Sequence, residues 1–203
     1  MTRPPLLFWD VDTQIDFMHP DGKLYVPGAE NVIPNIQRLN TSAKNNRVLV
    51  LSSADAHQPT DPEFADYPPH CLAGTPGQEK VEGTVLPRHF VIPNCRVDIP
   101  QDLLTYDQII VQKQATDVFT NPNMDAVLQL LGQREVVLYG VVTEICVEKA
   151  AHGLIRRGYR VNVVEDAIRH LDAAKGQATI DYVLQHGGKT LTTSEAIHTV
   201  ESQ

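Results

Sequence analysis

Three residues whose side chains can act together in nucleophilic catalysis each follow an apolar segment of the sequence: Asp12, Lys113 and Cys146. An apolar run ends at Gly140, and a helix is predicted to begin near Thr143, so Cys146 lies in the first turn of that helix. Free backbone N–H groups and the dipole at a helix N-terminus favour a thiolate, so we expect a lowered pKa for Cys146. The position predicts a cysteine nucleophile, although a free cysteine is more often an inert buried thiol.

Asp12 and Lys113 would stand at the carboxyl ends of two strands, after the apolar runs 6–11 and 108–112. Open α/β sheets bind their ligands at this edge. A carboxylate there can accept the proton of a thiol, and a lysine beside both groups favours their charged forms. Taken singly, such an aspartate is more often a turn cap and such a lysine more often a solvated strand end. Together with Cys146 they predict an activated nucleophile.

A second group of candidate residues lies in the loop 54–77, which is rich in proline, aspartate and histidine. Asp55 and His57 alternate directly after a predicted strand, so both side chains can face the same ion. Glu63 and His70 follow in the same loop, while Cys71 would point away and is not counted as a ligand. Oxygen and imidazole ligands suit zinc, iron(II) or manganese, so the set predicts one divalent metal ion, zinc first. The alternative is a set of ordinary polar residues on a surface loop.

The elements that must position these residues alternate along the chain. Helix-type periodicity and helix start signals predict helices at 31–45, 123–132, 143–157 and 172–185, and a last helix capped by Ser194. Apolar runs predict strands at 6–11, 47–53, 108–112, 136–139, 160–164 and 189–191. This alternation predicts one α/β domain over residues 1–203, doubly wound, with a mostly parallel central sheet and helices on both faces. Residues 78–107 are too weakly patterned to assign.

Composition excludes several classes of function. The net charge of −8 argues against a nucleic-acid partner, and no apolar stretch approaches the ~18 residues that cross a membrane. The three cysteines form no short-spaced pair, which indicates a reducing compartment, and no signal peptide is recognised, so we expect a cytoplasmic protein. The fingerprints of dinucleotide, nucleoside triphosphate and serine-hydrolase sites are absent from the sequence.

The motifs resemble those of a known family. DTQIDF (12–17), DAH (55–57), YPPHCLAGTPG (67–77), the strand-ending Lys113 and GVVTEICV (140–147) occur in the order found in cysteine hydrolases of the isochorismatase/nicotinamidase group. The D-x-H and P-P-H-C-x-x-G-T-P-G pieces resemble nicotinamidases in particular. The resemblance therefore implies an isochorismatase-like hydrolase fold and hydrolysis of a small amide.

The resemblance also implies roles in catalysis. Asp12 would deprotonate Cys146, Lys113 would stabilise the pair, and Cys146 would attack the carboxamide carbon. The backbone N–H groups of Val142 and Cys146 would hold the oxyanion. A cis peptide bond would join Val141 and Val142. Water activated by Asp12 would then cleave the thioester.

Substrate binding is implied in the same way. Asp55, His57 and His70 match the metal ligands of the family, with Glu63 at a position that is often histidine, and the metal would bind the pyridine nitrogen of nicotinamide. Side chains expected to line the substrate pocket are Phe17, Tyr67, Phe119, Val141 and Ile145. Tyr67 stands where many nicotinamidases have tryptophan, and Ile145 where some have histidine or tyrosine, so both departures concern the identity of the substrate.

The leading hypothesis is a nicotinamidase that forms a thioester. Because members of the family often form dimers or tetramers, we also expect a homo-oligomer. One alternative is a related cysteine amidohydrolase acting on another small amide or carbamoyl compound. Another is a non-catalytic metal-binding protein of the same fold.

Overall fold

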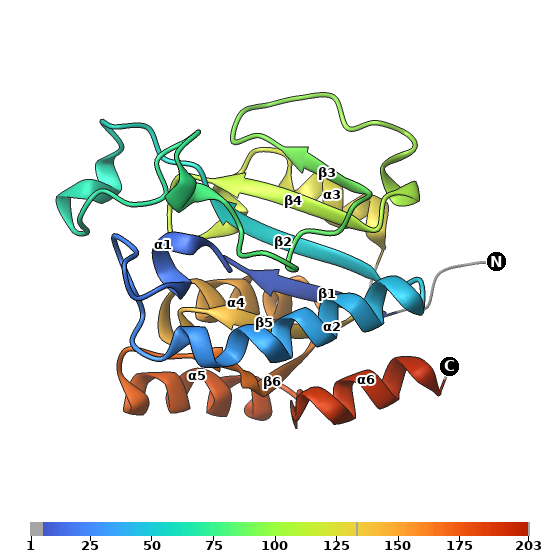
Figure 1. Cartoon of the computed structure of the whole chain (residues 1–203). Helices are drawn as coiled ribbons and strands as arrows, with labels where there is room; N and C mark the ends of the chain where they lie inside the picture. Colours follow the sequence, from blue (N-terminus) through green and yellow to red (C-terminus); the bar gives the residue numbers. More distant parts are fainter. Residues whose placement is uncertain (1–5, 133, 203) are drawn as a thin grey trace.

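The computed structural model describes residues 6–132 and 134–202; the ends of the predicted domain, residues 1–5 and 203, and residue 133 lie outside this range. In the described part of the chain, seven strands form one sheet in the order β3-β4-β2-β1-β5-β6-β7, and every pair of neighbours is parallel. The prediction of a doubly wound α/β fold is confirmed (Figure 1). The strands are β1 Leu6–Val11, β2 Leu49–Asp55, β3 His89–Ile92, β4 Gln108–Lys113, β5 Glu135–Val141, β6 Arg160–Arg169 and β7 Thr190–Leu191.

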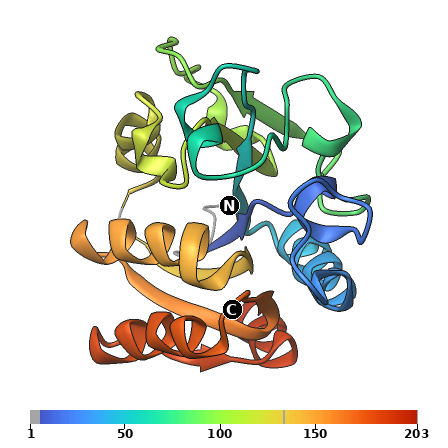
Figure 2. The same cartoon turned by 90° about the vertical axis from the view of Figure 1, so that its left-hand side faces the viewer.

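Helices cover both faces of the sheet. On one face lie α2 (Ile33–Asn45) and α6 (Thr193–Glu201), and on the other lie α3 (Met124–Leu131), α4 (Glu148–Arg156) and α5 (Ala173–Gln185) (Figure 2). Each turns an apolar stripe toward the strands, because apolar residues recur at helical spacing. The single turn α1 (Ile15–Met18) follows β1 at the carboxyl edge. Short 3-10 turns occupy Ala29–Val32, Pro62–Ala65, Pro76–Gln78, Leu103–Thr105 and Val118–Thr120.

The central strands are buried along their whole length, as expected for a parallel sheet covered on both faces. Because β4, β2, β1 and β5 are neighbours, their carboxyl ends lie side by side at one edge. This edge faces the loop between β2 and β3, at the left of Figure 1. The sheet order thus brings the ends of four strands, Lys113, Asp55, Val11 and Val141, to one place.

Several local expectations need correction. The helix predicted from Thr143 begins as a π-helical turn, Thr143–Val147, and becomes α4 only at Glu148. The last helix is capped by Thr192 and not by Ser194, because Thr192 and Glu195 form a reciprocal pair of hydrogen bonds at its first turn. The unassigned region contains the edge strand β3. Among the described residues, none of the helices combines the length and the apolar character that a membrane span requires.

Candidate active site

Asp12, Lys113 and Cys146 meet at the carboxyl edge of the sheet, and all three are buried. The Lys113 ammonium lies 3.0 Å from Asp12 Oδ2 and 3.7 Å from Cys146 Sγ. Its third neighbour is Asp55, which accepts a short hydrogen bond from the same Nζ. Asp12 Oδ1 accepts a hydrogen bond of 2.7 Å from the Ser53 hydroxyl. The strand ends therefore place a carboxylate, an ammonium and a thiol around one buried point.

The thiol of Cys146 has a pKa well above its ordinary value of 9.0, so the expected lowering is wrong. Burial is the main cause, and the carboxylates of Asp12 and Asp55 act in the same direction, while Lys113 opposes them. The π-helical turn adds its own N-terminal N–H groups, but these do not offset the loss of water around the sulfur. Cys146 thus rests as a neutral thiol.

Asp12 is the group placed to accept that proton. Burial raises its pKa, against the opposing effect of Lys113, and the Lys113 ammonium contacts both the Asp12 carboxylate and the Cys146 thiol. Burial alone would lower the pKa of Lys113, but Asp12 and Asp55 raise it well above its ordinary value. The lysine therefore stays charged, and the exchangeable proton lies between the thiol and the Asp12 carboxylate.

The backbone around this point has unusual conformations. Asp12 has a φ of 47° and the peptide bond between Val141 and Val142 is cis, as the resemblance implies. Gly140 has a φ of 116°, and a Cβ there would lie 2.1 Å from the carbonyl oxygen of Val11. Only glycine fits at this position near the end of β5, because the backbone of β1 occupies the space of a side chain.

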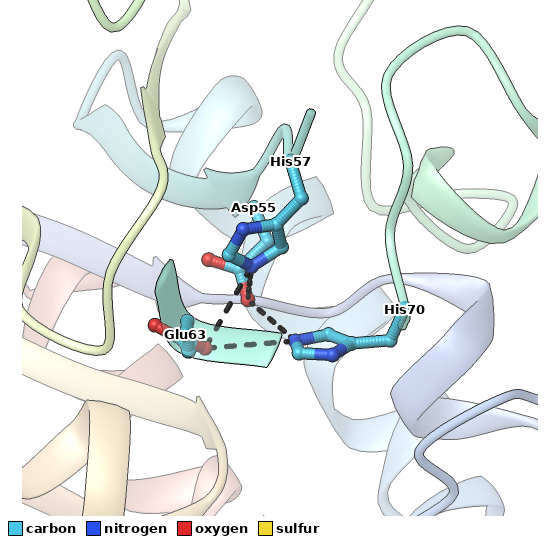
Figure 3. A group of neighbouring side chains, drawn as sticks. All are labelled: Asp55, His57, Glu63 and His70. Carbon is cyan, nitrogen blue, oxygen red and sulfur yellow. Dashed lines mark ion pairs between the residues drawn. The ribbon is translucent and has the colours of Figure 1, made fainter. Parts of the chain in front are cut away.

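Asp55, His57, Glu63 and His70 lie together (Figure 3), and Asp55 joins them to Lys113 of the triad. The Nε2 atoms of the two histidines each lie between the two carboxylates. His57 Nε2 is 3.7 Å from both Asp55 Oδ2 and Glu63 Oε1. His70 Nε2 is 3.6 Å from Asp55 Oδ2 and 3.7 Å from Glu63 Oε1. The predicted ligand set is thus brought to one point.

This arrangement fits a divalent metal ion. Bonds of about 2.1 Å to a tetrahedral ion would separate neighbouring ligand atoms by about 3.4 Å. The four carboxylate–imidazole distances of 3.6–3.7 Å are close to this value, and all four ligand atoms lie within 4.8 Å of one another. The Nε2 of His57 is buried and has no hydrogen-bond partner, as expected of a nitrogen that donates its lone pair to a metal. Two carboxylates and two imidazoles supply donors suited to zinc, iron(II) or manganese.

The other ring nitrogens are held by residues that the sequence reasoning missed or did not use. His57 Nδ1 lies 3.0 Å from Asp61 Oδ2, and His70 Nδ1 lies 2.8 Å from the carbonyl oxygen of Pro68. Such bonds fix the tautomer that presents Nε2 to a metal. The sequence did contain a signal for the first of these contacts, because Asp61 is an acidic residue only four positions after His57.

Asp55 belongs to both groups of residues. Its Oδ1 pairs with Lys113, while its Oδ2 faces the histidines of the metal-type group. Burial would raise its pKa, but Lys113, His57 and His70 together hold it well below its usual range. Asp55 is therefore an ionised bridge between the Asp12–Lys113–Cys146 group and the metal-type group.

Aromatic rings line one side of the metal-type group. The rings of Phe17 and Tyr67 lie 5.2 Å and 6.5 Å from the ring of His70. Phe64, which the sequence analysis did not single out, lies 5.0 Å from His57 and 5.7 Å from His70. These rings place apolar surface next to the imidazoles of the group.

The remaining predicted pocket residues lie in different surroundings. Val141 is buried at the end of β5, and Ile145 is half-buried in the π-helical turn with Cys146. Phe119 packs in another direction: its ring lies 6.1 Å from Trp9 and beneath the Arg157 guanidinium at 4.1 Å. Its recorded ring contacts therefore join Phe119 to the core and α4, not to the aromatic rings around His70.

A model of the isochorismatase domain family matches residues 6–195. The chain belongs to this family. The fold is similar to that of the pyrazinamidase of Pyrococcus horikoshii, solved in complex with zinc. That protein is 26% identical, with a TM-score of 0.75 over 93% of this chain and 99% of that one.

Two further relatives of this isochorismatase-family chain act on other amides. The N-carbamoylsarcosine amidase of Thermoplasma acidophilum is 25% identical, with a TM-score of 0.74 over 94% of this chain and 97% of that one. The ureidoacrylate amidohydrolase of Rhizobium rhizogenes is 27% identical over 86% of this chain and 73% of its own length. The family resemblance inferred from the motifs is confirmed, and the chain is an isochorismatase-family hydrolase.

Proposed function

We propose that this protein is a nicotinamidase that hydrolyses nicotinamide to nicotinate and ammonia through a thioester on Cys146. The observation that carries the proposal is the shared carboxylate of Asp55, which joins the Asp12–Lys113–Cys146 group to the four metal-type ligands. A group that attacks an amide carbon thus stands next to one that can hold a ring nitrogen.

The residues of the chain account for each transfer. Asp12 takes the proton of Cys146 as Sγ attacks the carboxamide carbon, and Lys113 stabilises the negative charge that moves between them. The N–H groups of Val142 and Cys146 hold the oxyanion. Asp12 then returns the proton to the leaving nitrogen, and ammonia departs. Asp12 next takes a proton from the water that cleaves the thioester and passes it to the released Cys146 thiolate as nicotinate leaves.

The metal site would orient the substrate. Asp55, His57, Glu63 and His70 would hold one divalent ion, which would supply a Lewis acid for the pyridine nitrogen. Zinc is our first expectation, supported by the zinc-bound pyrazinamidase relative, with iron or manganese as alternatives. The rings of Phe17, Phe64 and Tyr67 suit a flat aromatic amide.

A second candidate is hydrolysis of another small amide or a carbamoyl compound, because two relatives carry such names. A third is a metal-binding protein without catalysis. The raised pKa of Cys146 favours it, because a neutral thiol is a weaker nucleophile than a thiolate. We further propose that the protein works in the cytoplasm as a homo-oligomer, with a small-molecule amide as its partner and neither nucleic acid nor membrane.

Ammonia release and metal content test these alternatives together. Purified protein would be analysed for bound metal and assayed with nicotinamide, pyrazinamide, N-carbamoylsarcosine and ureidoacrylate. The proposal expects one divalent ion per chain and the highest kcat/KM for nicotinamide. Faster turnover of a carbamoyl compound would favour the second candidate. Bound metal with no ammonia from any substrate would favour the third.

A further inference from the structure

The segment 12–17 touches both halves of the site. Asp12, at one end, pairs with Lys113 near the thiol, and Phe17, at the other end, lies 5.2 Å from the His70 ring. Between them, Gln14 and Asp16 are polar side chains buried in the protein, at 0% and 6% exposure. Neither belongs to the triad or to the metal-type group, so their burial needs another explanation.

Gln14 clamps the backbone of Asp55 on both of its sides. Its Oε1 accepts a hydrogen bond of 2.7 Å from the Asp55 N–H, and its Nε2 donates one of 2.8 Å to the Asp55 carbonyl oxygen. The same Nε2 donates a bond of 2.7 Å to the carbonyl oxygen of Gln78. One amide therefore ties the turn after Asp12 to the strand end that carries a metal-type ligand.

Asp16 holds the other ligand segment. Its Oδ2 accepts a bond of 2.6 Å from the N–H of Cys71, the residue directly after His70, and its Oδ1 accepts one of 3.0 Å from the Lys23 N–H. Cys71 has a φ of 43°, an uncommon conformation for a residue with a side chain. A Cβ at Gly77 would lie 2.3 Å from Asp16 Oδ2, so the loop is closely packed around this carboxylate.

We propose that Gln14 and Asp16 are positioning residues that hold Asp55 and His70 at a fixed separation from the Asp12–Cys146 pair. The inference rests on the proposed function, in which the ring of the substrate is held at one group and its amide carbon is attacked at the other. A displacement of about 1 Å between two such groups can cost ~100-fold in rate. A single segment that contacts both prevents this displacement.

The test compares two buried glutamines that each accept one hydrogen bond from a backbone N–H and donate two. Gln14→Glu keeps the volume and an acceptor for the Asp55 N–H, but it turns a carboxylate oxygen toward two carbonyl oxygens. Gln108, at the start of β4, is the matched control. Its Oε1 accepts from the Leu86 N–H at 2.7 Å, and its Nε2 donates to the Ser52 hydroxyl at 2.8 Å and the Thr84 carbonyl at 2.9 Å. Gln108→Glu should therefore destabilise the fold without moving the site.

Two readouts separate positioning from general destabilisation. Zinc affinity, measured by competition with a chromophoric chelator on the folded fraction, should fall roughly 10- to 100-fold in Gln14→Glu. The kcat with nicotinamide should fall by ~100-fold, with a smaller change in KM. Gln108→Glu should keep the zinc affinity and the kcat of the unaltered protein, even where its Tm is lower.

The inference would be overturned by equal losses of zinc affinity in Gln14→Glu and Gln108→Glu. If Gln14→Glu does not fold, Asp16→Asn takes its place in the same comparison, because it keeps the side-chain volume and removes the charge that Cys71 binds. If the unaltered protein binds zinc but does not hydrolyse nicotinamide, the proposed function fails. The affinity comparison still decides the roles of Gln14 and Asp16 in that case.

Discussion

The two halves of the site are built in different ways. Lys113 ends β4, Asp12 directly follows β1, and Cys146 lies in the π-helical turn after β5. Lys113 contacts both of the others inside the protein. Of the metal-type ligands only Asp55 belongs to a strand, while the other three lie on the loop after β2. Strand ends hold the reacting groups through the sheet itself, whereas the loop relies on side-chain hydrogen bonds such as that between His57 and Asp61. The first half should therefore depend on the sheet, and the second on the hydrogen bonds that hold the loop.

This difference predicts separable failures. Changes in the triad should stop the chemistry and leave metal binding intact, and changes on the loop should weaken metal binding and leave the thiol chemistry intact. Lys113 is the exception, because it contacts Asp55 as well as Asp12.

Cys146→Ala should have the largest effect on activity. Without the sulfur no thioester forms, so ammonia release from nicotinamide should fall by ~10³-fold or more. Metal content should stay that of the unaltered protein, because Cys146 does not belong to the ligand group. Cys95→Ala, at an exposed free cysteine, is the control and should keep full activity. Retained turnover in Cys146→Ala would exclude the thioester.

Lys113→Met should damage both halves at once. It leaves the buried carboxylates of Asp12 and Asp55 without their cation, a change that costs about 3–5 kcal/mol of unfolding free energy. The pKa of Asp12, already raised, should rise further and remove the base. Denaturant unfolding and ammonia assays measure the two effects. A variant as stable as the unaltered protein would show that the ion pairs contribute little.

His70→Ala should affect the loop half alone. Loss of one of four ligands should lower zinc affinity strongly, and kcat/KM with nicotinamide should fall by ~10- to 100-fold. Alkylation of Cys146 by iodoacetamide should continue, because the thiol keeps Asp12 and Lys113. His198→Ala, on the exposed face of α6, is the control for histidine loss. Loss of Cys146 alkylation in His70→Ala would contradict the separation of the two halves.

The Asp12–Lys113–Cys146 group could be predicted from the geometry of a parallel sheet, and the metal-type group from the residue types in one loop. Parallel strands order their carboxyl ends at one edge, so the meeting of Asp12, Lys113 and Cys146 follows from the position of three apolar runs. The sign of the pKa shift of Cys146 could not be predicted in this way. Local helix effects were visible in the sequence, but burial and the nearby carboxylates depend on tertiary packing.

The roles of some residues near the metal-type group could not be predicted either, because they also depend on tertiary packing. Phe64 contacts both histidines only because the loop folds back on itself, and Gln14 and Asp16 act through the backbone of distant residues. The contacts of Phe119 with Trp9 and Arg157 depend on the direction of a short turn after β4. Sequence spacing does not determine such a direction.

The pH dependence of Cys146 alkylation distinguishes the effect of the helix N-terminus, which lowers the pKa, from that of burial, which raises it. Burial raises the pKa of Cys146 above 9.0, so its alkylation rate in a Cys95→Ala background should still increase above pH 9. Burial also raises the pKa of Asp12 above 3.8, and Asp12 must be ionised to act as the base. The acid limb of kcat/KM should therefore lie above pH 3.8. A plateau of alkylation below pH 9 would restore the helix-dipole interpretation.

The pKa shift of Asp12 also determines how its contribution to the free energy of unfolding changes with pH. A carboxyl group whose pKa is higher in the folded state binds protons more tightly there than in the unfolded chain. The contribution of Asp12 is thus present below pH 3.8 and is lost as the pH rises through its folded pKa. Asp55, whose pKa is lowered, has the opposite sign: its contribution is present above pH 3.8 and is lost as the pH falls.

Asp61→Asn should have the smallest effect and gives the finest test of the comparison. The amide oxygen of asparagine can still accept a hydrogen bond from His57 Nδ1, but the negative charge that favours this tautomer is gone. Zinc affinity should fall by about 10-fold, the lower end of the range for such partners, and excess zinc should restore full kcat. Asp66→Asn, at an exposed position on the same loop, should change neither. A kcat that stays low at saturating zinc would mean that the loop also positions the reacting groups, and that the two halves are not separable.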